Sequence, residues 1–85
     1  MKFTAEINVM PRREILDPQG KAVRLGLHNL GIDSIEQVRI GKHMTLHLEA
    51  ANSEEARQKV EEACQRLLAN AIMENYTFEI LEGES

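Results

Sequence analysis

Cys64 is the only thiol in this chain of 85 residues, and a thiolate is an intrinsically strong nucleophile. Catalysis would also need a base and an oxyanion hole beside it. Cys64 instead stands in the middle of a predicted helix, at the edge of an apolar stripe, and no strand–turn–helix elbow surrounds it. We interpret it as a packed side chain, because free cysteine is among the most buried residue types.

His43, His47 and Glu49 could be metal ligands, because they fall within one predicted strand and His47 shares a face with Glu49. A closed site would need further ligands from other elements, so solvated strand residues are the better interpretation. His28 stands alone on a helix and indicates no site. We therefore expect no catalytic, cofactor-binding or metal-binding residue in this chain.

The stretch Asp17–Lys21, with the sequence DPQGK, has the residue types of an anion-binding loop before a helix. Its glycine pattern is not that of a Walker loop, and Asp17 carries the wrong charge to bind an anion. Asp17 is a good helix N-cap, and Pro18 suits the first helical position. The stretch therefore predicts the start of a helix over about residues 18–30.

Apolar residues recur at helical spacing in this helix, at Val23, Leu27 and Leu30, and Gly31 is a natural stop. We expect this stripe to face the core. Gly20 lies on the same stripe and would let the helix approach a sheet closely. Leu25 points the other way and could contact a partner.

Lys21, Arg39 and Lys42 are cations for which the sequence shows no obvious intramolecular purpose. Plain surface charge is the simplest interpretation of them. Together with the outward Leu25, they are nevertheless our candidates for contacts with partner proteins.

The elements that position these residues follow from local patterns. Strict alternation of polar and apolar residues predicts a strand over residues 2–10, and shorter alternating runs predict strands over 36–41, 42–49 and 76–80. A second helix is predicted from Asn52 or Ser53 to about Asn70. The order β-α-β-β-α-β indicates a ferredoxin-like α+β fold, with a four-stranded antiparallel sheet and both helices on one face.

Gly41 lies between two of the predicted strands and so predicts a hairpin. A two-residue turn would pair Ile40 with His43 and mix apolar and polar side chains on one face. An odd-length loop pairs Ile40 with Met44 instead, and we prefer it because it keeps the apolar side chains together. The opposite face of the sheet is polar, so we expect it to be wet or to meet a polar partner surface.

Length and charge exclude several classes of protein. We expect one domain over residues 1–85, because the chain has no room for a second core. The net charge of −4 argues against a nucleic-acid binder, and the few aromatic residues argue against RNA stacking. A single cysteine fits a reducing cytoplasm, and the sequence shows neither a signal peptide nor a membrane span.

Three segments, LDPQGKAV, VRIGKHMTLHLEA and LLANAIMENYTFEI, together resemble the PurS family, in order and over nearly the whole chain. This family is the small subunit of phosphoribosylformylglycinamidine (FGAM) synthase, an enzyme complex of de novo purine synthesis. The pairing of Asp17–Lys21 with Arg39, Gly41 and Lys42 is the most specific part of the resemblance.

The resemblance implies a non-catalytic subunit within an ATP- and glutamine-dependent ligase complex. The expected partners are a second copy of the chain, a glutaminase subunit that releases ammonia, and a large synthetase subunit. ATP and Mg²⁺ are expected in that large subunit, and no cofactor is expected in this chain. The small subunit would bridge the other two and support the transfer of ammonia.

Two other functions stay open on the residues alone. The chain could be an ACT-like regulatory module that senses a small molecule, because similar β-α-β-β-α-β domains bind amino acids at dimer interfaces. A stand-alone enzyme is the least favoured, because no catalytic set is indicated.

Overall fold

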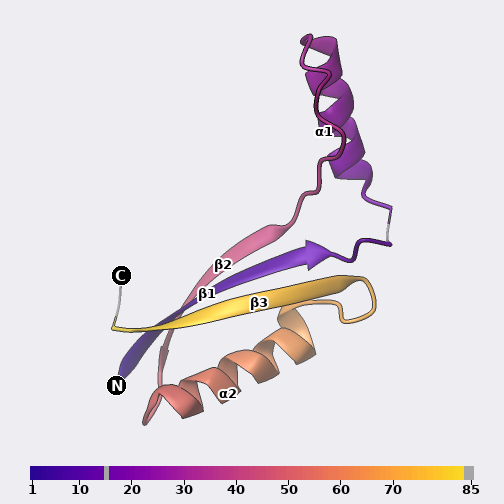
Figure 1. The fold of residues 1–85 in the computed structure, drawn as a ribbon. Helices are drawn as coiled ribbons and strands as arrows, with labels where there is room; N and C mark the ends of the chain where they lie inside the picture. The colour runs from indigo at the N-terminus through magenta and orange to yellow at the C-terminus, as the bar shows by residue number, and fades with distance from the viewer. Residues whose placement is uncertain (15, 84–85) are drawn as a thin grey trace.

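The computed structural model describes residues 1–14 and 16–83, in which three strands, two helices and a π-helical turn follow one another. Figure 1 shows them along the chain. They are β1 (Lys2–Pro11), α1 (Pro18–Asn29), β2 (Lys42–Glu49), α2 (Ser53–Ala63), η1 (Cys64–Leu68, the π-helical turn) and β3 (Glu74–Glu82). The predicted α+β class is confirmed.

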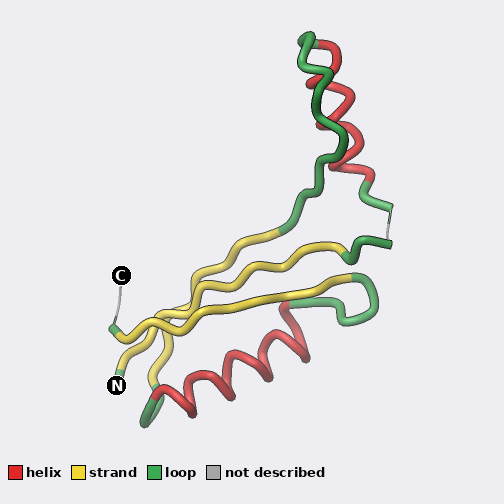
Figure 2. The backbone as a smooth tube through the Cα atoms, viewed as in Figure 1, coloured by secondary structure: helices red, strands yellow, loops and turns green. Residues whose placement is uncertain are grey.

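The three strands form one antiparallel sheet in the order β2-β1-β3, so that β1 lies in the centre (Figure 2). Ile7 of β1 pairs with Met44 on one side and with Phe78 on the other. Paired residues point to the same face, so this register gathers the apolar residues of all three strands on one side. The strands predicted at residues 2–10, 42–49 and 76–80 are confirmed.

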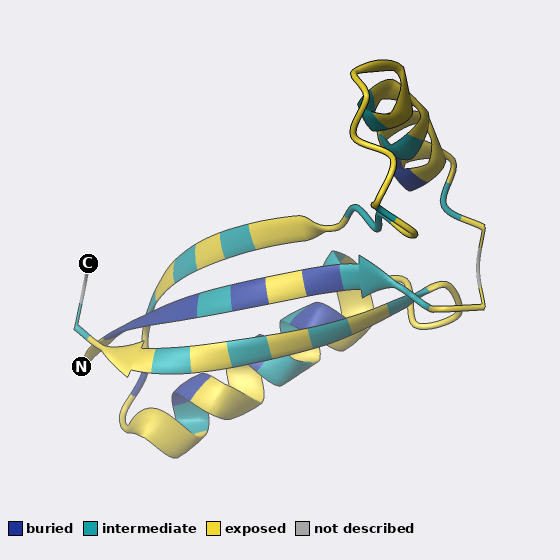
Figure 3. Ribbon diagram, turned by 45° about the horizontal axis from the view of Figure 1, so that its top comes forward, coloured by how far each residue is buried: buried dark blue, intermediate teal, exposed yellow. Residues whose placement is uncertain are grey.

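The apolar face of the sheet is covered by α2, which lies over β1 and β3 (Figure 1). The fully buried apolar residues of β1 are Phe3, Ala5, Ile7 and Val9. Val60 and Cys64 complete this core from the helical side. Figure 3 shows the buried residues concentrated along β1 and the inner side of α2. Burial of one large apolar side chain stabilises by about 1.5–3 kcal/mol, so most of the stability lies in this layer.

The helix over the sheet starts where the sequence predicts and ends slightly earlier. Asn52 is its N-cap, and its side chain accepts a hydrogen bond from the Glu55 N–H at 2.9 Å. After Ala63 the chain makes the π-helical turn η1, so the helical path stops at Leu68 and not near Asn70.

An arm, made of α1 and residues 30–41, projects beyond the end of the sheet (Figures 1 and 2). α1 starts at Pro18 after the Asp17 cap, as predicted, and Gly31 follows it with a positive φ of 86°. Residues 33–41 run back along α1 as an extended segment and join β2. The molecule consequently measures 52 × 28 × 14 Å along its principal axes.

The arm corrects two predictions about the sheet. The sheet of the described chain has three strands and not four, and α1 does not lie on the same face as α2. The reason is that the chain does not reverse at Gly41. This glycine lies against the carbonyl of Val9 and against Met10, where a side chain would collide, and the extended segment passes it directly into β2 without a hairpin (Figure 2).

The apolar stripe of α1 is also placed differently from the prediction. Val23 and Leu30 are 44% and 77% exposed, and Gly20 is the only buried residue of this helix. The stripe was expected to face the core, but α1 lies beyond the end of the sheet and does not pack against it (Figure 1).

Candidate functional site

The base of the arm is organised by Asp17. Its Oδ1 accepts a hydrogen bond from the Gly20 N–H, and its Oδ2 accepts one from the Ile40 N–H, both at 2.9 Å. These two backbone donors lower the pKa of Asp17 below its ordinary value, because they stabilise the carboxylate. Asp17 therefore caps α1, as predicted, and also fastens it to the extended segment, which the sequence did not show.

Gly20 allows α1 and the extended segment to touch. A Cβ atom at this position would collide with the carbonyl oxygen of Val38 and would lie 2.9 Å from its carbonyl carbon. The close approach predicted for Gly20 is therefore present, but it is made to residue 38 and not to the sheet.

Two arginines tie the arm together through backbone carbonyls. Arg24 donates from Nε to the carbonyl of Ile35 at 3.1 Å. Arg39 donates from its guanidinium to the carbonyl of Pro11, at the end of β1. Arg39 thus has an intramolecular role that the sequence did not indicate.

A cleft of about 260 Å³ opens between α1 and the extended segment. Four cationic side chains line it, from Arg13, Lys21, Arg24 and Arg39. Asp17 and Glu36 are the only carboxylates in the lining, and Asp17 is occupied by backbone donors. The cleft is therefore suited to an anionic group or to an acidic protein surface.

Lys21 is the least committed of these cations. Among the residues that the structure describes, its ammonium makes no hydrogen bond or ion pair, whereas Arg24 and Arg39 each hold a carbonyl. Arg13 and Arg24 were not singled out from the sequence. The signal for Arg24 was its position three residues after Lys21, on the same side of the helix.

The structure brings together two of the four predicted contact residues. Lys21 and Arg39 share the cleft, whereas Lys42 lines a second hollow of about 630 Å³ at the junction of arm and sheet. Lys42 also lies 3.8 Å from a carboxylate oxygen of Glu74. Leu25 stands further along α1 and is 62% exposed, which agrees with its predicted outward direction.

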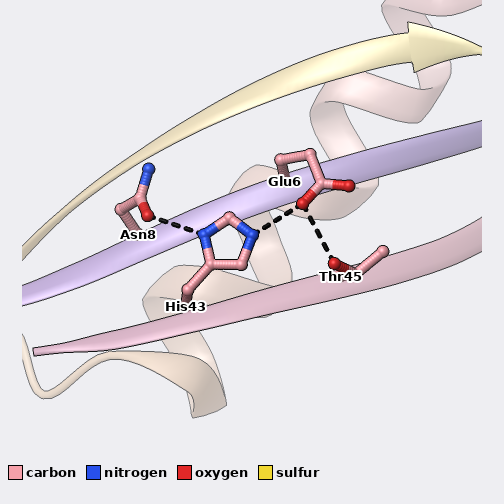
Figure 4. A network of polar contacts seen from close by, with 4 residues as sticks. All are labelled: Glu6, Asn8, His43 and Thr45. Carbon is pink, nitrogen blue, oxygen red and sulfur yellow. Dashed lines mark hydrogen bonds and ion pairs between the residues drawn. The ribbon is translucent and has the colours of Figure 1, made fainter.

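The polar face of the sheet carries a second cluster, shown in Figure 4. His43 lies with Nε2 2.7 Å from Oε2 of Glu6 and with Nδ1 2.7 Å from Oδ1 of Asn8. Thr45 donates to the same oxygen of Glu6 at 3.0 Å. The bonds from His43 and Thr45 lower the pKa of Glu6. The cluster links β1 to β2 across the exposed face.

The candidate residues for covalent and metal chemistry stand apart from the arm. Cys64 is fully buried, and burial raises the pKa of its thiol, so its interpretation as a packed side chain is confirmed. His47 lies 3.2 Å from the hydroxyl of Thr4. In the described part of the chain, no group of three His, Cys, Asp or Glu side chains is placed to hold a metal ion. No helix within this part is both long and apolar enough to cross a membrane.

These features define a class of protein, a small α+β protein with a projecting arm and a cationic cleft at its base. A family model described as PurS, phosphoribosylformylglycinamidine (FGAM) synthase, matches residues 4–82. The chain belongs to this family. The resemblance seen in the sequence is confirmed.

Individual relatives agree with the family match. The chain is 48% identical to the PurS subunit of FGAM synthase from Synechocystis, over 95% of this chain and 83% of the relative. The solved structure of Bacillus subtilis PurS is 36% identical and superposes with a TM-score of 0.85 over 94% of this chain and 99% of that chain. A chain in the structure of PurLQS from Thermotoga maritima is 32% identical, with a TM-score of 0.87 over 95% of this chain and 99% of that chain.

Proposed function

We propose that this chain is the small, non-catalytic subunit of FGAM synthase, and that it bridges the glutaminase and the large synthetase subunits. The complex converts formylglycinamide ribonucleotide, ATP and glutamine into formylglycinamidine ribonucleotide, ADP, phosphate and glutamate. The observation that carries the proposal is the family match over residues 4–82, together with the likeness to a chain of the PurLQS structure. The ACT-like sensing module is not favoured by these comparisons.

The division of labour within the complex follows from the same proposal. The glutaminase releases ammonia, the large subunit holds ATP and Mg²⁺ and activates the amide, and this chain supports the passage of ammonia between them. The chain itself needs no cofactor and acts in the cytoplasm as a single domain. It also associates with a second copy of itself.

The arm supplies the contacts with the partner subunits. Lys21, Arg39 and Lys42 present positive charge near the base of the arm, and Leu25 presents an apolar side chain on the outer side of α1. Opposite charge steers association, and an exposed leucine beside it provides apolar area to bury. An acidic patch on a partner subunit is the surface that fits this arrangement.

Reconstitution tests the bridging role. The glutaminase and the synthetase are mixed with and without this chain, and each mixture receives either glutamine or ammonia. Loss of the reaction with glutamine alone is expected, because only coupling would be missing. Loss with both nitrogen sources would show that the synthetase itself needs this chain, and loss with neither would reject the proposal.

Lys21 gives the sharpest test of the arm contacts. The Lys21→Ala variant should weaken assembly and the glutamine-dependent rate without changing the fold, because its ammonium has no partner in the described residues. The comparison variant is Lys59→Ala in α2; because Lys59 pairs with Glu55 and donates to the carbonyl of Glu49, the stability of both variants is measured beside their assembly. Arg39 and Lys42 are less clean targets, because each also holds a group of this chain. If both variants assembled equally well, Lys21 would not be part of the interface with the partner subunits.

A further inference from the structure

The cations that line the cleft of the arm differ from other cations of the molecule in what they contact. Lys42, Lys59 and Arg66, which lie outside this cleft, each form an ion pair with a glutamate, at 3.8, 3.1 and 2.9 Å. Within the described residues, none of the four cations of the cleft forms an ion pair. The positive charge of the cleft is therefore not compensated by contact with a carboxylate.

Two of these cations are fixed in place by neutral acceptors. Arg24 donates to the carbonyl of Ile35 through Nε, and that bond leaves both terminal nitrogens of its guanidinium unused. Arg39 donates to the carbonyl of Pro11, and both arginines are half-buried. A carbonyl orients a guanidinium without removing its charge. Because the two groups are oriented in advance, an anion that binds them loses less free energy to their ordering.

The walls of the cleft are fastened to each other as well. They are α1 and the extended segment, which run side by side (Figure 2). Asp17 accepts hydrogen bonds from the N–H groups of Gly20 and Ile40, one on each wall, and Gly20 lies against the backbone of Val38. The cleft thus has its shape before a ligand arrives, as most small-molecule sites do.

Charge and size narrow the class of ligand. Four cations and two carboxylates line the cleft, which leaves a net charge of +2, so an anion with two negative charges would balance it. The volume of about 260 Å³ lies below the roughly 300–1,000 Å³ of sites for drug-sized ligands. The planar fork of a guanidinium matches the oxygens of a phosphate group. A small phosphate dianion meets all three conditions.

We propose that the cleft of the arm binds a phosphate dianion, either inorganic phosphate or the phosphate end of a sugar phosphate. Arg24 and Arg39 donate from fixed positions, and the exposed Arg13 and Lys21 close on the remaining oxygens. The site goes beyond the bridging role. It takes from the proposed function only that the reaction uses a ribonucleotide and releases phosphate, so phosphate groups are present where the chain acts.

A titration with inorganic phosphate tests the site on the isolated chain. Amide NMR signals are followed while sodium chloride keeps the ionic strength constant, because salt screens all exposed charges. The amide signals of Lys21, Val38 and Arg39 and the Nε–H signals of Arg24 and Arg39 should shift and then saturate. The same titration with sodium chloride alone should give no saturating shift.

Variants of the two cations that hold no other group of the described chain make the test specific to the cleft. Hydrogen bonds to charged groups are strong, so Arg13→Gln combined with Lys21→Gln should weaken phosphate binding about tenfold or more. Lys21→Gln alone is matched by Arg66→Gln, which makes the same change in charge in an exposed pair outside the cleft. The control should bind phosphate like the wild type, and the amide spectra report whether each variant is folded.

Two further probes distinguish the sources of phosphate. Ribose 5-phosphate binding more tightly than inorganic phosphate would assign the site to a sugar phosphate, with ribose as the control for the sugar. Equal or tighter binding of inorganic phosphate would assign it to the free ion. Either result supports a phosphate site, whereas binding of neither probe rejects it.

Two other results would overturn the proposal: shifts that do not saturate, and equal weakening of binding by Lys21→Gln and Arg66→Gln. If phosphate does not bind while Lys21→Ala still weakens assembly, the cations serve the partner subunits alone, and the phosphate site is rejected. If phosphate binds but reconstitution shows no bridging, the site stands and the proposed function fails. The two failures are therefore told apart.

Discussion

The sheet layer consists of the three strands and α2, and in it the apolar residues of β1 are buried against the helix. In the arm, by contrast, the apolar residues of α1 remain in contact with solvent. The two regions also differ in the contacts that hold them. The sheet layer has a continuous apolar core, while the arm is held by a carboxylate and two arginines that reach backbone groups. The buried apolar core that stabilises the fold therefore lies in the sheet layer, whereas the arm mainly adds exposed surface.

The largest expected effect is in the sheet layer. Replacing Ile7, which is 0% exposed, by alanine should lower the free energy of unfolding by roughly 2–5 kcal/mol, because a cavity remains in the core. Chemical denaturation measures this loss. A change below about 1 kcal/mol would mean that the core is looser than the structure shows, since well-packed sites relax only partly.

Gly20 should be the most sensitive position of the arm. Alanine there forces apart α1 and the extended segment and should cost about 1–3 kcal/mol locally, because the obstacle is backbone. Gly26→Ala is the matched control: nothing lies near its added Cβ, so helix propensity should make it neutral or stabilising by up to about 1 kcal/mol. Amide exchange over residues 18–29 separates the two, and equal protection in both variants would contradict the contact.

Asp17 should make the arm sensitive to acid. Its pKa is lowered in the folded chain, so its contribution is present above the ordinary value of 3.8 and is lost as the pH falls through the folded pKa. The amide signals of Gly20 and Ile40 should shift together with a midpoint below 3.8 in an NMR titration. Asp17→Asn should abolish the common transition, and a midpoint at or above the ordinary value would show that the carboxylate does not hold these groups.

Leu25 should show the smallest effect on stability. Leu25→Ala should change the free energy of unfolding by less than about 0.5 kcal/mol, because this side chain is already in solvent. It should nevertheless reduce binding to the partner subunits in a pull-down. Leu67→Ala, which truncates an 82% exposed leucine of η1, outside the arm, is the control and should bind normally.

The sheet layer could be predicted from the sequence because its signals are local. Alternation marked β1 and β3, and the helical spacing of Val60 and its neighbours marked α2. The alternation of Val38 and Ile40 predicted a fourth strand, but residues 36–41 run extended and pair with no strand of the described chain. What it could not show was the neighbour of that segment, since pairing depends on whether the chain reverses at Gly41.

The sequence likewise predicted only those parts of the candidate site that depend on local structure. The cap at Asp17 and the exposure of Leu25 follow from helix geometry, which is local. Three features join segments that are distant in sequence: the hydrogen bond that the Ile40 N–H donates to Asp17, the bond from Arg39 to the carbonyl of Pro11, and the shared cleft of Arg13 and Lys21. The spacing of residues along the sequence does not show which distant segments come into contact.

The central place of β1 has a consequence for how the chain folds. Phe3 pairs with Leu48 on one side and with Glu82 on the other, so β1 finds its second neighbour only after β2 and α2 have been made. Such long-range pairings slow folding, because loop-closure entropy is lost before the contacts form. Until β3 is present, the central strand lacks one neighbour, so the core closes only after β3 has joined the sheet.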